Sequence, residues 1–222
     1  MTALTLHAIP DWASVIIRFA LEEMGEPYSL SHKDRDAGDL DSAAFRAINP
    51  VGLIPAMETP DGPMFETAAI LLWLTDRTGK LAPGPKDPER AAFLSWLFFT
   101  SNTLHTAAMA LIYPERAAGE DAAKAAVAVA HEQVQARLGL IEAMITDRQP
   151  GWLSASEPGV LGYYIGTLVR WMTMLPPAPY AASLDAFPAL RAVLAAHEAR
   201  PAALRVAIAD GLGPTPFTNP VF

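Results

Sequence analysis

The sequence predicts two domains of different class, an α/β domain at the N-terminus and an all-α domain after it. Up to about residue 80, short apolar runs typical of strands alternate with segments whose apolar residues recur at helical spacing. Residues 81–88 then hold three prolines and one glycine, through which a helix cannot continue. No convincing strand pattern follows. We therefore expect an α/β domain over 1–80, a linker over 81–88 and a helical domain over 89–222.

The first domain is predicted to follow the order β-α-β-α-β-β-α. The expected elements are strands at 4–7 and 28–31, helices at 12–24, 42–48 and 67–78, and two short strands at 55–58 and 64–65. The first two strands are linked through a helix, so they should run parallel. The last two flank Asp61-Gly62, a strong hairpin signal, so they should be antiparallel.

The second domain is predicted to contain about five helices and to end in an extended arm. The helices are expected at 89–113, 122–145, 157–174, 189–199 and 201–209. Residues 211–222 are rich in Gly, Pro and Asn, which is typical of a chain end without regular structure. Gly159-Val-Leu-Gly162 holds neither polar residue of a capping box of the form Ser/Thr-x-x-Asp.

Composition excludes several classes of function. The 222 residues carry 16 basic and 24 acidic side chains, a net charge of −8, so nucleic acid is not an expected partner. Cysteine is absent, which excludes disulfides, thiolate zinc sites and a protein thiol as nucleophile, and which suits a reducing cytoplasm. The five histidines are scattered, so no metal site is predicted. The most apolar stretch, 91–113, is interrupted by polar residues, so we expect a buried helix and no membrane partner.

Two segments carry most of the functional information. The first is Asn49-Pro50-Val51-Gly52-Leu53-Ile54-Pro55, in which a proline opens a predicted strand, a position where its missing N–H is tolerated. The second is Glu66-Thr67-Ala68-Ala69-Ile70, at the start of a predicted helix. Thr67 could cap that helix, whose free N–H groups form a site for an anion. The alternative is an ordinary acidic first turn that stabilises its own helix dipole.

These segments, in this order and spacing, resemble the glutathione S-transferase superfamily, particularly its bacterial beta-like and zeta-like members. The resemblance spans nearly the whole chain and implies a thioredoxin-like N-terminal domain with an all-α domain after it. It also implies a cis Ile54–Pro55 bond, against the alternative of a trans proline that ends a loop. The backbone of Ile54 would then meet the cysteinyl part of glutathione, and Glu66 and Thr67 its γ-glutamyl group.

The resemblance is weakest at the residue that activates the thiol. Relatives carry a Tyr at the end of the first strand, where this chain has His7 and no Tyr, or a Ser or Cys in the loop that follows. That loop reads Pro10-Asp-Trp-Ala-Ser14 here, and Ser14 is the only hydroxyl between Thr5 and Tyr28. Ser14 could hydrogen-bond a thiolate, or it could bind only its own backbone. His105 resembles a histidine near the active site of beta-class relatives, against the alternative of a packed helix residue. For the glycyl carboxylate the candidates are Lys33, Arg35 and position 53, where this chain has Leu and many relatives have Lys; Arg35 is the choice from its charge and proximity in sequence.

The function expected from this resemblance is conjugation of glutathione to a small hydrophobic electrophile. The acceptor pocket is expected near residues of both domains: Trp12, His105, Met109, Tyr113 and Tyr163. The other hypothesis is a glutathione-binding or protein-interaction module without transferase activity, which Ala13 at the Cys-like position and Leu53 favour. The resemblance, and the apolar helix at 91–113, also predict a homodimer. Glutathione would be the co-substrate, no metal would take part, and the location would be the cytoplasm.

Overall fold

The N-terminal domain is a mixed four-stranded sheet with helices on both faces. The structure is a computed structural model that describes residues 4–221, so 1–3 and 222, at the outer ends of the two expected domains, lie outside it. The elements of this domain are β1 (Leu4–Ala8), α1 (Ser14–Met24), β2 (Tyr28–His32), the 3-10 turn η1 (Asp39–Asp41), α2 (Ala43–Ile48), β3 (Ala56–Thr59), β4 (Gly62–Phe65) and α3 (Thr67–Thr78). The sheet order is β2-β1-β3-β4, with β1 parallel to β2 and antiparallel to β3. The predicted order of elements and the hairpin are confirmed.

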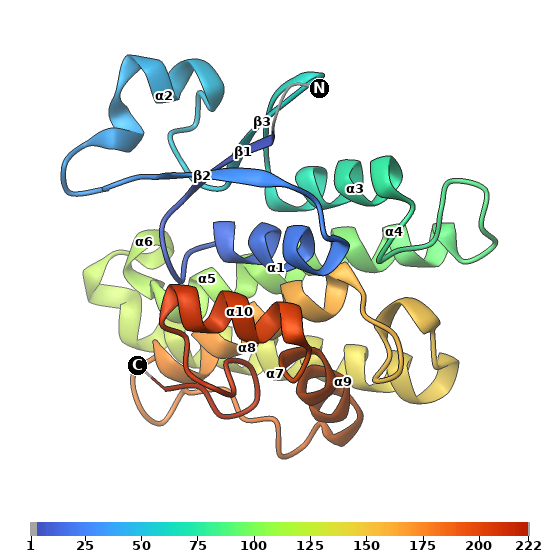
Figure 1. Ribbon diagram of the computed structural model, residues 1–222. Helices are drawn as coiled ribbons and strands as arrows, with labels where there is room; N and C mark the ends of the chain where they lie inside the picture. Colours follow the sequence, from blue (N-terminus) through green and yellow to red (C-terminus); the bar gives the residue numbers. More distant parts are fainter. Residues whose placement is uncertain (1–3, 222) are drawn as a thin grey trace.

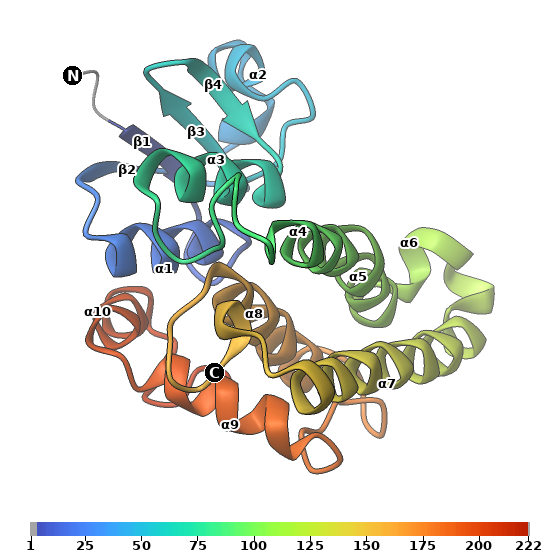
Figure 2. The same cartoon turned by 90° about the vertical axis from the view of Figure 1, so that its right-hand side faces the viewer.

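The two faces of the sheet are covered differently. Helices α1 and α3 lie between the sheet and the helical domain, and α2 lies on the opposite face (Figure 2). A small separate core holds α2 to the sheet through Leu40, Phe45, Ile54 and Ala56. The larger core runs from β1 and α1 into the helical domain without a break. Helix α1 is therefore the element that joins the two domains.

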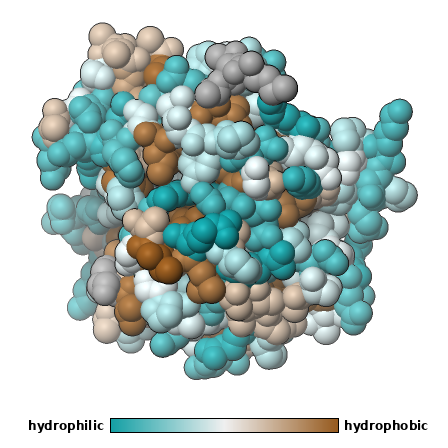
Figure 3. All heavy atoms as spheres, viewed as in Figure 1, coloured by the Kyte–Doolittle hydropathy of each residue, from teal (hydrophilic) through white to brown (hydrophobic). Residues whose placement is uncertain are grey.

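The C-terminal domain is all-helical over the described residues, as predicted. Its elements are α4 (Arg90–Phe99), the π-helix η2 (Thr100–His105), α5 (Thr106–Ile112), α6 (Pro114–Ala118), the 3-10 turn η3 (Glu120–Ala122), α7 (Ala123–Arg148), the 3-10 turn η4 (Gly151–Leu153), α8 (Val160–Met174), α9 (Pro188–Glu198) and α10 (Pro201–Asp210). The long helix predicted at 89–113 runs without a gap from Arg90 to Ile112 as α4, η2 and α5; π-helical segments such as η2 are often found at functional sites. No helix among the described residues is long and apolar enough to cross a bilayer. On the face drawn in Figure 3, apolar side chains stand in small groups among polar ones.

The extended arm predicted for the C-terminus is wrong over residues 211–221. The side chain of Phe217 is only 1% exposed and packs edge-on against Phe19 of α1. The carboxylate of Glu198 accepts hydrogen bonds from the backbone N–H groups of Phe217 and Thr218 and from the Thr218 hydroxyl. Glycine and proline here shape a folded return to the core, because a buried carboxylate supplies the hydrogen bonds that a helix or strand would have given.

An imidazole replaces the missing side-chain cap of α8. The Gly159 N–H donates to His197 Nε2 (3.0 Å), and His197 Nδ1 lies 2.9 Å from the carbonyl oxygen of Val193, to which it donates in this tautomer. A Cβ on Gly162 would lie 2.2 Å from His197 Nε2. The imidazole of His197 therefore fits here only because Gly162 has no side chain.

This arrangement predicts an acid-sensitive contribution to stability. Burial lowers the pKa of His197, and its Nε2 can accept from Gly159 only while the ring is neutral. His197 therefore makes its full contribution to the unfolding free energy above about pH 6.5, the pKa of a histidine in the unfolded chain. This contribution is lost as pH falls through the lower pKa that His197 has in the folded state. Between about pH 6.5 and that pKa, wild type should lose up to about 1.4 kcal/mol of unfolding free energy per pH unit more than His197→Gln.

Denaturant unfolding at several pH values checks this expectation. Burial also lowers the pKa of His7 and of His105, so the wild-type slope alone does not isolate His197. The difference in unfolding free energy between wild type and His197→Gln does isolate His197, because both proteins keep His7 and His105. Parallel pH profiles for the two proteins would contradict the cap assigned to His197.

Candidate functional site

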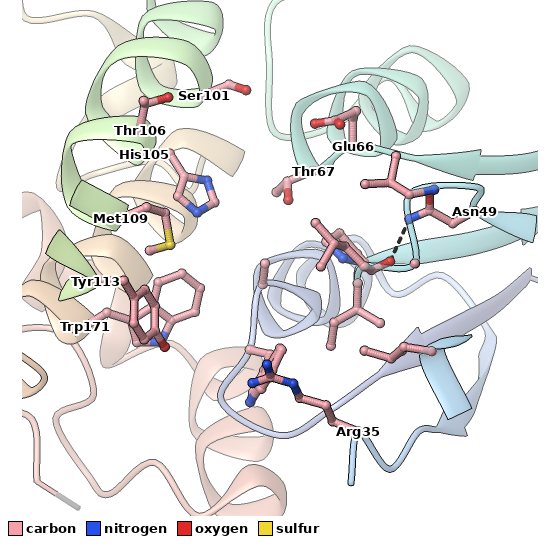
Figure 4. Close-up of a pocket in the computed structure, with 18 of the residues that line it drawn as sticks. Arg35, Asn49, Glu66, Thr67, Ser101, His105, Thr106, Met109, Tyr113 and Trp171 are labelled. Carbon is pink, nitrogen blue, oxygen red and sulfur yellow. Dashed lines mark hydrogen bonds between the residues drawn. The ribbon is translucent and has the colours of Figure 1, made fainter. Parts of the chain in front are cut away.

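A cleft of about 1030 Å³ opens between the two domains. Figure 4 shows its two walls, with Arg35, Glu66 and Thr67 on the side of the sheet and His105, Met109 and Trp171 on the helical side. Of the predicted glutathione-site residues, Arg35, Ile54, Pro55, Glu66, Thr67 and His105 line this cleft. Six predicted residues from four separate segments of the chain thus meet at one place.

The N-terminal wall is shaped by a turn that Asn49 holds. Its side-chain amide donates to the Leu53 carbonyl (2.6 Å), and its Oδ1 accepts from the Val51 N–H (3.0 Å). Gly52 has a φ of +70°, a backbone conformation that favours glycine. The Ile54–Pro55 bond is cis in the structure. The Asn-Pro-x-Gly pattern is therefore the local signal for a turn that leaves the backbone before β3 facing the cleft.

The start of α3 forms the second part of this wall. Glu66 occupies the cap position with a φ of +71°, and no side chain caps the helix, so the expected capping role of Thr67 is wrong. Thr67 is instead the first helical residue and is buried. The N–H groups of the first turn are thus left without a side-chain acceptor, and the partial positive charge of the helix end stays available to an anion.

His105 lies on the helical wall, at the end of η2. Its Nδ1 is 2.9 Å from the hydroxyl of Tyr164 on α8, and the two rings are nearly perpendicular. Burial lowers the pKa of His105 to about 4, so the ring is neutral near pH 7. Burial also raises the pKa of Tyr164, which therefore keeps its proton. In Figure 4 the imidazole projects from η2 toward the wall that carries Thr67.

Ser14 does not lie among the residues that line the cleft, which corrects its expected place beside a thiolate. Its side chain is 1% exposed. The hydroxyl accepts from the Ile9 N–H (3.2 Å) and donates to the Ile9 carbonyl (3.0 Å). The alternative reading of Ser14, as a hydroxyl that binds backbone at the start of its helix, describes this position.

One further expectation about this region needs correction, and a neighbouring acid has partners in the helical domain. The carboxylate of Asp11 accepts from Arg170 (2.9 Å) and from Trp171 Nε1 (3.1 Å). Tyr163, expected at the acceptor pocket, points the other way and donates to Glu23 Oε2 (2.6 Å), stacked on Phe19. The neighbouring Tyr164 lines the cleft instead. Two adjacent tyrosines on a buried helix face opposite sides, which the sequence does not distinguish.

Two arginines at the cleft stack on aromatic rings. The guanidinium carbon of Arg35 lies 5.6 Å from the centre of the Trp12 ring, on the N-terminal wall. That of Arg116 lies 3.5 Å from the centre of the Tyr113 ring, on the helical wall. Sequence analysis named Asn49 as part of the turn motif but not its hydrogen-bonding role. It missed Arg116 and Tyr164, which nothing local marks.

No cluster that could hold a metal ion occurs among residues 4–221, which are those with described positions. The polar groups of the cleft are instead suited to an organic ligand with its own charges. An acid at Glu66, a helix end at Thr67 and a guanidinium at Arg35 can bind an ammonium and two carboxylates, respectively.

Comparisons with known proteins agree on one family. Residues 14–77 match the model of the glutathione S-transferase N-terminal domain. The chain is 28% identical to maleylacetoacetate isomerase of Pseudomonas aeruginosa over 86% of this chain and 88% of that protein. It is 30% identical to glutathione S-transferase F14 of Arabidopsis thaliana, over 48% of this chain and 44% of that protein.

Solved structures extend the likeness to the helical domain. A glutathione transferase from Burkholderia graminis, with two glutathione molecules bound per subunit, superposes with a TM-score of 0.78 at 27% identity. The match covers 92% of this chain and 87% of that one. The matched N-terminal model, the order of elements and this near full-length superposition lead to one conclusion: the chain belongs to the glutathione S-transferase superfamily.

Proposed function

We propose that this protein is a glutathione-dependent transferase that presents the glutathione thiolate to a small hydrophobic electrophile. The observation that carries the proposal is the cleft itself, where Glu66 and the start of α3 lie on one wall and His105 on the other. The bound glutathione of the Burkholderia graminis relative supports the choice of ligand. The maleylacetoacetate isomerase relative supports glutathione-dependent chemistry, transferase or isomerase.

The charges of glutathione would be matched group by group on the N-terminal wall. The ammonium of the γ-glutamyl group would pair with Glu66, and its carboxylate with the N–H groups at Thr67. The backbone of Ile54 would pair with the cysteinyl amide, as an added strand does. Arg35, held over Trp12, would take the glycyl carboxylate. This orientation leaves the sulfur directed toward the helical wall.

His105 would stabilise the thiolate as a neutral hydrogen-bond donor. When Tyr164 donates its hydroxyl proton to Nδ1, the hydrogen of the neutral ring is on Nε2, where it can meet a sulfur anion. The thiol proton would pass to water, and the ring would not itself change charge, because its pKa is about 4. Tyr164 would act through His105 as a positioning residue.

The electrophile would lie against the helical wall, where Met109, Trp171 and Leu175 line the cleft. These side chains offer apolar and aromatic surface and no charge, which suits a small hydrophobic acceptor. Sulfur would attack the electrophilic carbon from the opposite wall. Placing the two reactants in one cleft supplies the orientation that a bimolecular reaction in water lacks.

The competing function is glutathione binding without catalysis. It remains a candidate because the loop at 10–14 offers no cleft-facing hydroxyl or thiol in the structure. A glutathione-affinity resin followed by an assay with a chromogenic aryl halide separates the two. Retention with turnover supports the transferase, retention alone supports the binding protein, and no retention contradicts both.

Replacing Glu66 should weaken glutathione binding more than replacing Ser14. Glu66→Gln removes the partner of the ammonium, and we expect Kd to rise about tenfold. Ser14→Ala should leave Kd nearly unchanged and lower the unfolding free energy by ~1 kcal/mol, because both backbone groups of Ile9 lose their partner. Titration calorimetry and denaturant unfolding measure the two effects.

The matched control is Glu58→Gln. Glu58 is an exposed acid on β3 of the same domain that pairs with His7 and does not line the cleft. It should leave Kd for glutathione unchanged. Equal losses of affinity for the Glu66 and Glu58 variants, or for the Glu66 and Ser14 variants, would defeat this assignment.

Removing the donor at His105 should raise the pKa of the bound glutathione thiol. A hydrogen bond to an anion contributes ~1.5–3 kcal/mol, so His105→Ala should raise that pKa by about one to two units toward the ordinary thiol value of about 8.5. Tyr164→Phe keeps the ring and loses the contact with Nδ1, so it should produce a smaller rise. Thiolate absorbance, titrated against pH with glutathione bound, measures the pKa.

The control for this titration is His131→Ala. His131 lies on α7, where Nδ1 is 2.9 Å from the Tyr180 carbonyl oxygen, outside the cleft lining. It should leave the thiol pKa unchanged. A wild-type thiol pKa equal to that of free glutathione would remove the catalytic role from His105 and leave the binding protein as the better description.

The proposal includes a homodimer, in the cytoplasm, as the expected working form. Phe98 on α4 and Leu140 on α7 are about half exposed, and a groove of about 410 Å³ between these helices is lined by Trp96, Leu140 and Met144. A second subunit would cover such surface. Light scattering at micromolar concentration should give about twice the monomer mass of 23.8 kDa; the monomer mass would contradict the expectation.

A further inference from the structure

Arg116 is a positioned cation on the helical wall that the proposed glutathione site does not use. It lies on α6, its guanidinium stacks on Tyr113, and both residues line the cleft. Among residues 4–221 it takes part in no ion pair within the structure. A stacked guanidinium keeps its planar fork of donors free and fixed in direction, which is the geometry that binds a carboxylate.

The other charged residues of the cleft already have partners, in the structure or in the proposed complex, whereas Arg116 has none among the described residues. Of the acidic side chains that line it, Asp11 pairs with Arg170 and Asp41 pairs with Arg46. The third, Glu66, is the proposed partner of the glutathione ammonium. Of the lining arginines, Arg35 is assigned to the glycyl carboxylate, and the other carboxylate of glutathione is assigned to α3. Once every charge of glutathione has a partner, one guanidinium remains.

That guanidinium stands beside the apolar acceptor surface. Met109 lies on α5, and Tyr113 follows one turn later, directly after the end of that helix. Arg116 comes next, on α6. The helical wall thus combines a flat apolar surface with one charged end. The complementary ligand has an apolar or aromatic body and one anionic end.

We propose that Arg116 binds a carboxylate of the acceptor substrate, so that the preferred electrophiles are small apolar molecules that carry a carboxylate away from the reacting carbon. This inference rests on the proposed function and assigns its substrate class. Because the chain carries a net charge of −8, long-range attraction does not draw such an anion to the protein. Recognition is local, and Arg116 determines the specificity.

A matched pair of aryl chlorides tests the assignment: 4-chloro-3-nitrobenzoate and its methyl ester. In each, the glutathione sulfur forms a bond to the ring carbon that carries chlorine, and chloride leaves with the electron pair of the C–Cl bond. The two probes differ in the charge opposite that carbon. Each enzymatic rate is divided by the uncatalysed rate with glutathione, which removes the intrinsic difference in reactivity.

The variant is Arg116→Gln, and the matched control is Arg191→Gln. Arg191 lies on α9, is half exposed, pairs with Asp185 and does not line the cleft. In Arg116→Gln, kcat/KM for the benzoate should fall about tenfold relative to that for the ester, chiefly through KM. In Arg191→Gln the ratio should stay at its wild-type value. Raising the ionic strength should shrink the wild-type advantage of the benzoate and leave the ester unaffected.

Each other outcome has a definite meaning. A benzoate-to-ester ratio that is the same in wild type and Arg116→Gln, or that changes equally in Arg191→Gln, overturns the inference and leaves the transferase intact. Calorimetry without glutathione binding to wild type overturns the proposed function itself. If glutathione binds and neither probe reacts, calorimetry with the two aryl–glutathione conjugates replaces kinetics. The carboxylate conjugate must then lose about tenfold more affinity than its ester in Arg116→Gln, and an equal loss overturns the inference.

Discussion

The buried guanidinium of Arg170 is the constraint on which the cleft depends. Its side chain is 2% exposed and donates to the carboxylate of Asp11 and to the carbonyl oxygens of Leu212 and Val221. One charge thereby fixes the loop before α1, the helix α8 and the C-terminal segment relative to one another. A buried charge must be fully hydrogen-bonded to be tolerated, so these three segments have one arrangement that satisfies it. Asp11 keeps a left-handed backbone (φ +55°) in that arrangement.

The same loop explains why the hydroxyl of Ser14 and the charge of Asp11 are not available to a ligand. Ser14 holds both backbone groups of Ile9, and Asp11 neutralises Arg170, so each polar group near the start of α1 is used to shape the cleft. The groups that stay available come from elsewhere: the start of α3, the imidazole of His105 and two stacked guanidiniums. Structural and chemical roles are divided between segments, with little overlap.

His105 and His197 show how burial gives two histidines different tasks in one domain. Burial lowers the pKa of both, so both rings are neutral near pH 7. His197 is enclosed, with Nε2 used by Gly159 and Nδ1 by Val193, and it serves the helix start. His105 has one described partner, Tyr164, and its other nitrogen is left for the cleft. The number of partners, and not the pKa, separates the structural ring from the candidate catalytic one.

The order of elements can be predicted from the amino-acid sequence alone, because it depends on local patterns: apolar periodicity, turn residues and helix starts. The segments 49–55 and 66–70 were singled out through resemblance, and both contribute residues to the cleft. The sequence also named Arg35, from its charge and proximity in sequence, and His105, through resemblance, and both residues line the cleft. Four features became visible only in the folded structure: Ser14 binds Ile9, Tyr164 and not Tyr163 meets His105, the C-terminal segment folds back onto Glu198, and Arg116 stacks on Tyr113. Each of these depends on which polar groups meet after the chain has folded, and often on residues far apart in sequence. Periodicity reports which face of an element is buried, but it does not report the partner that a buried or cleft-facing polar atom finds there.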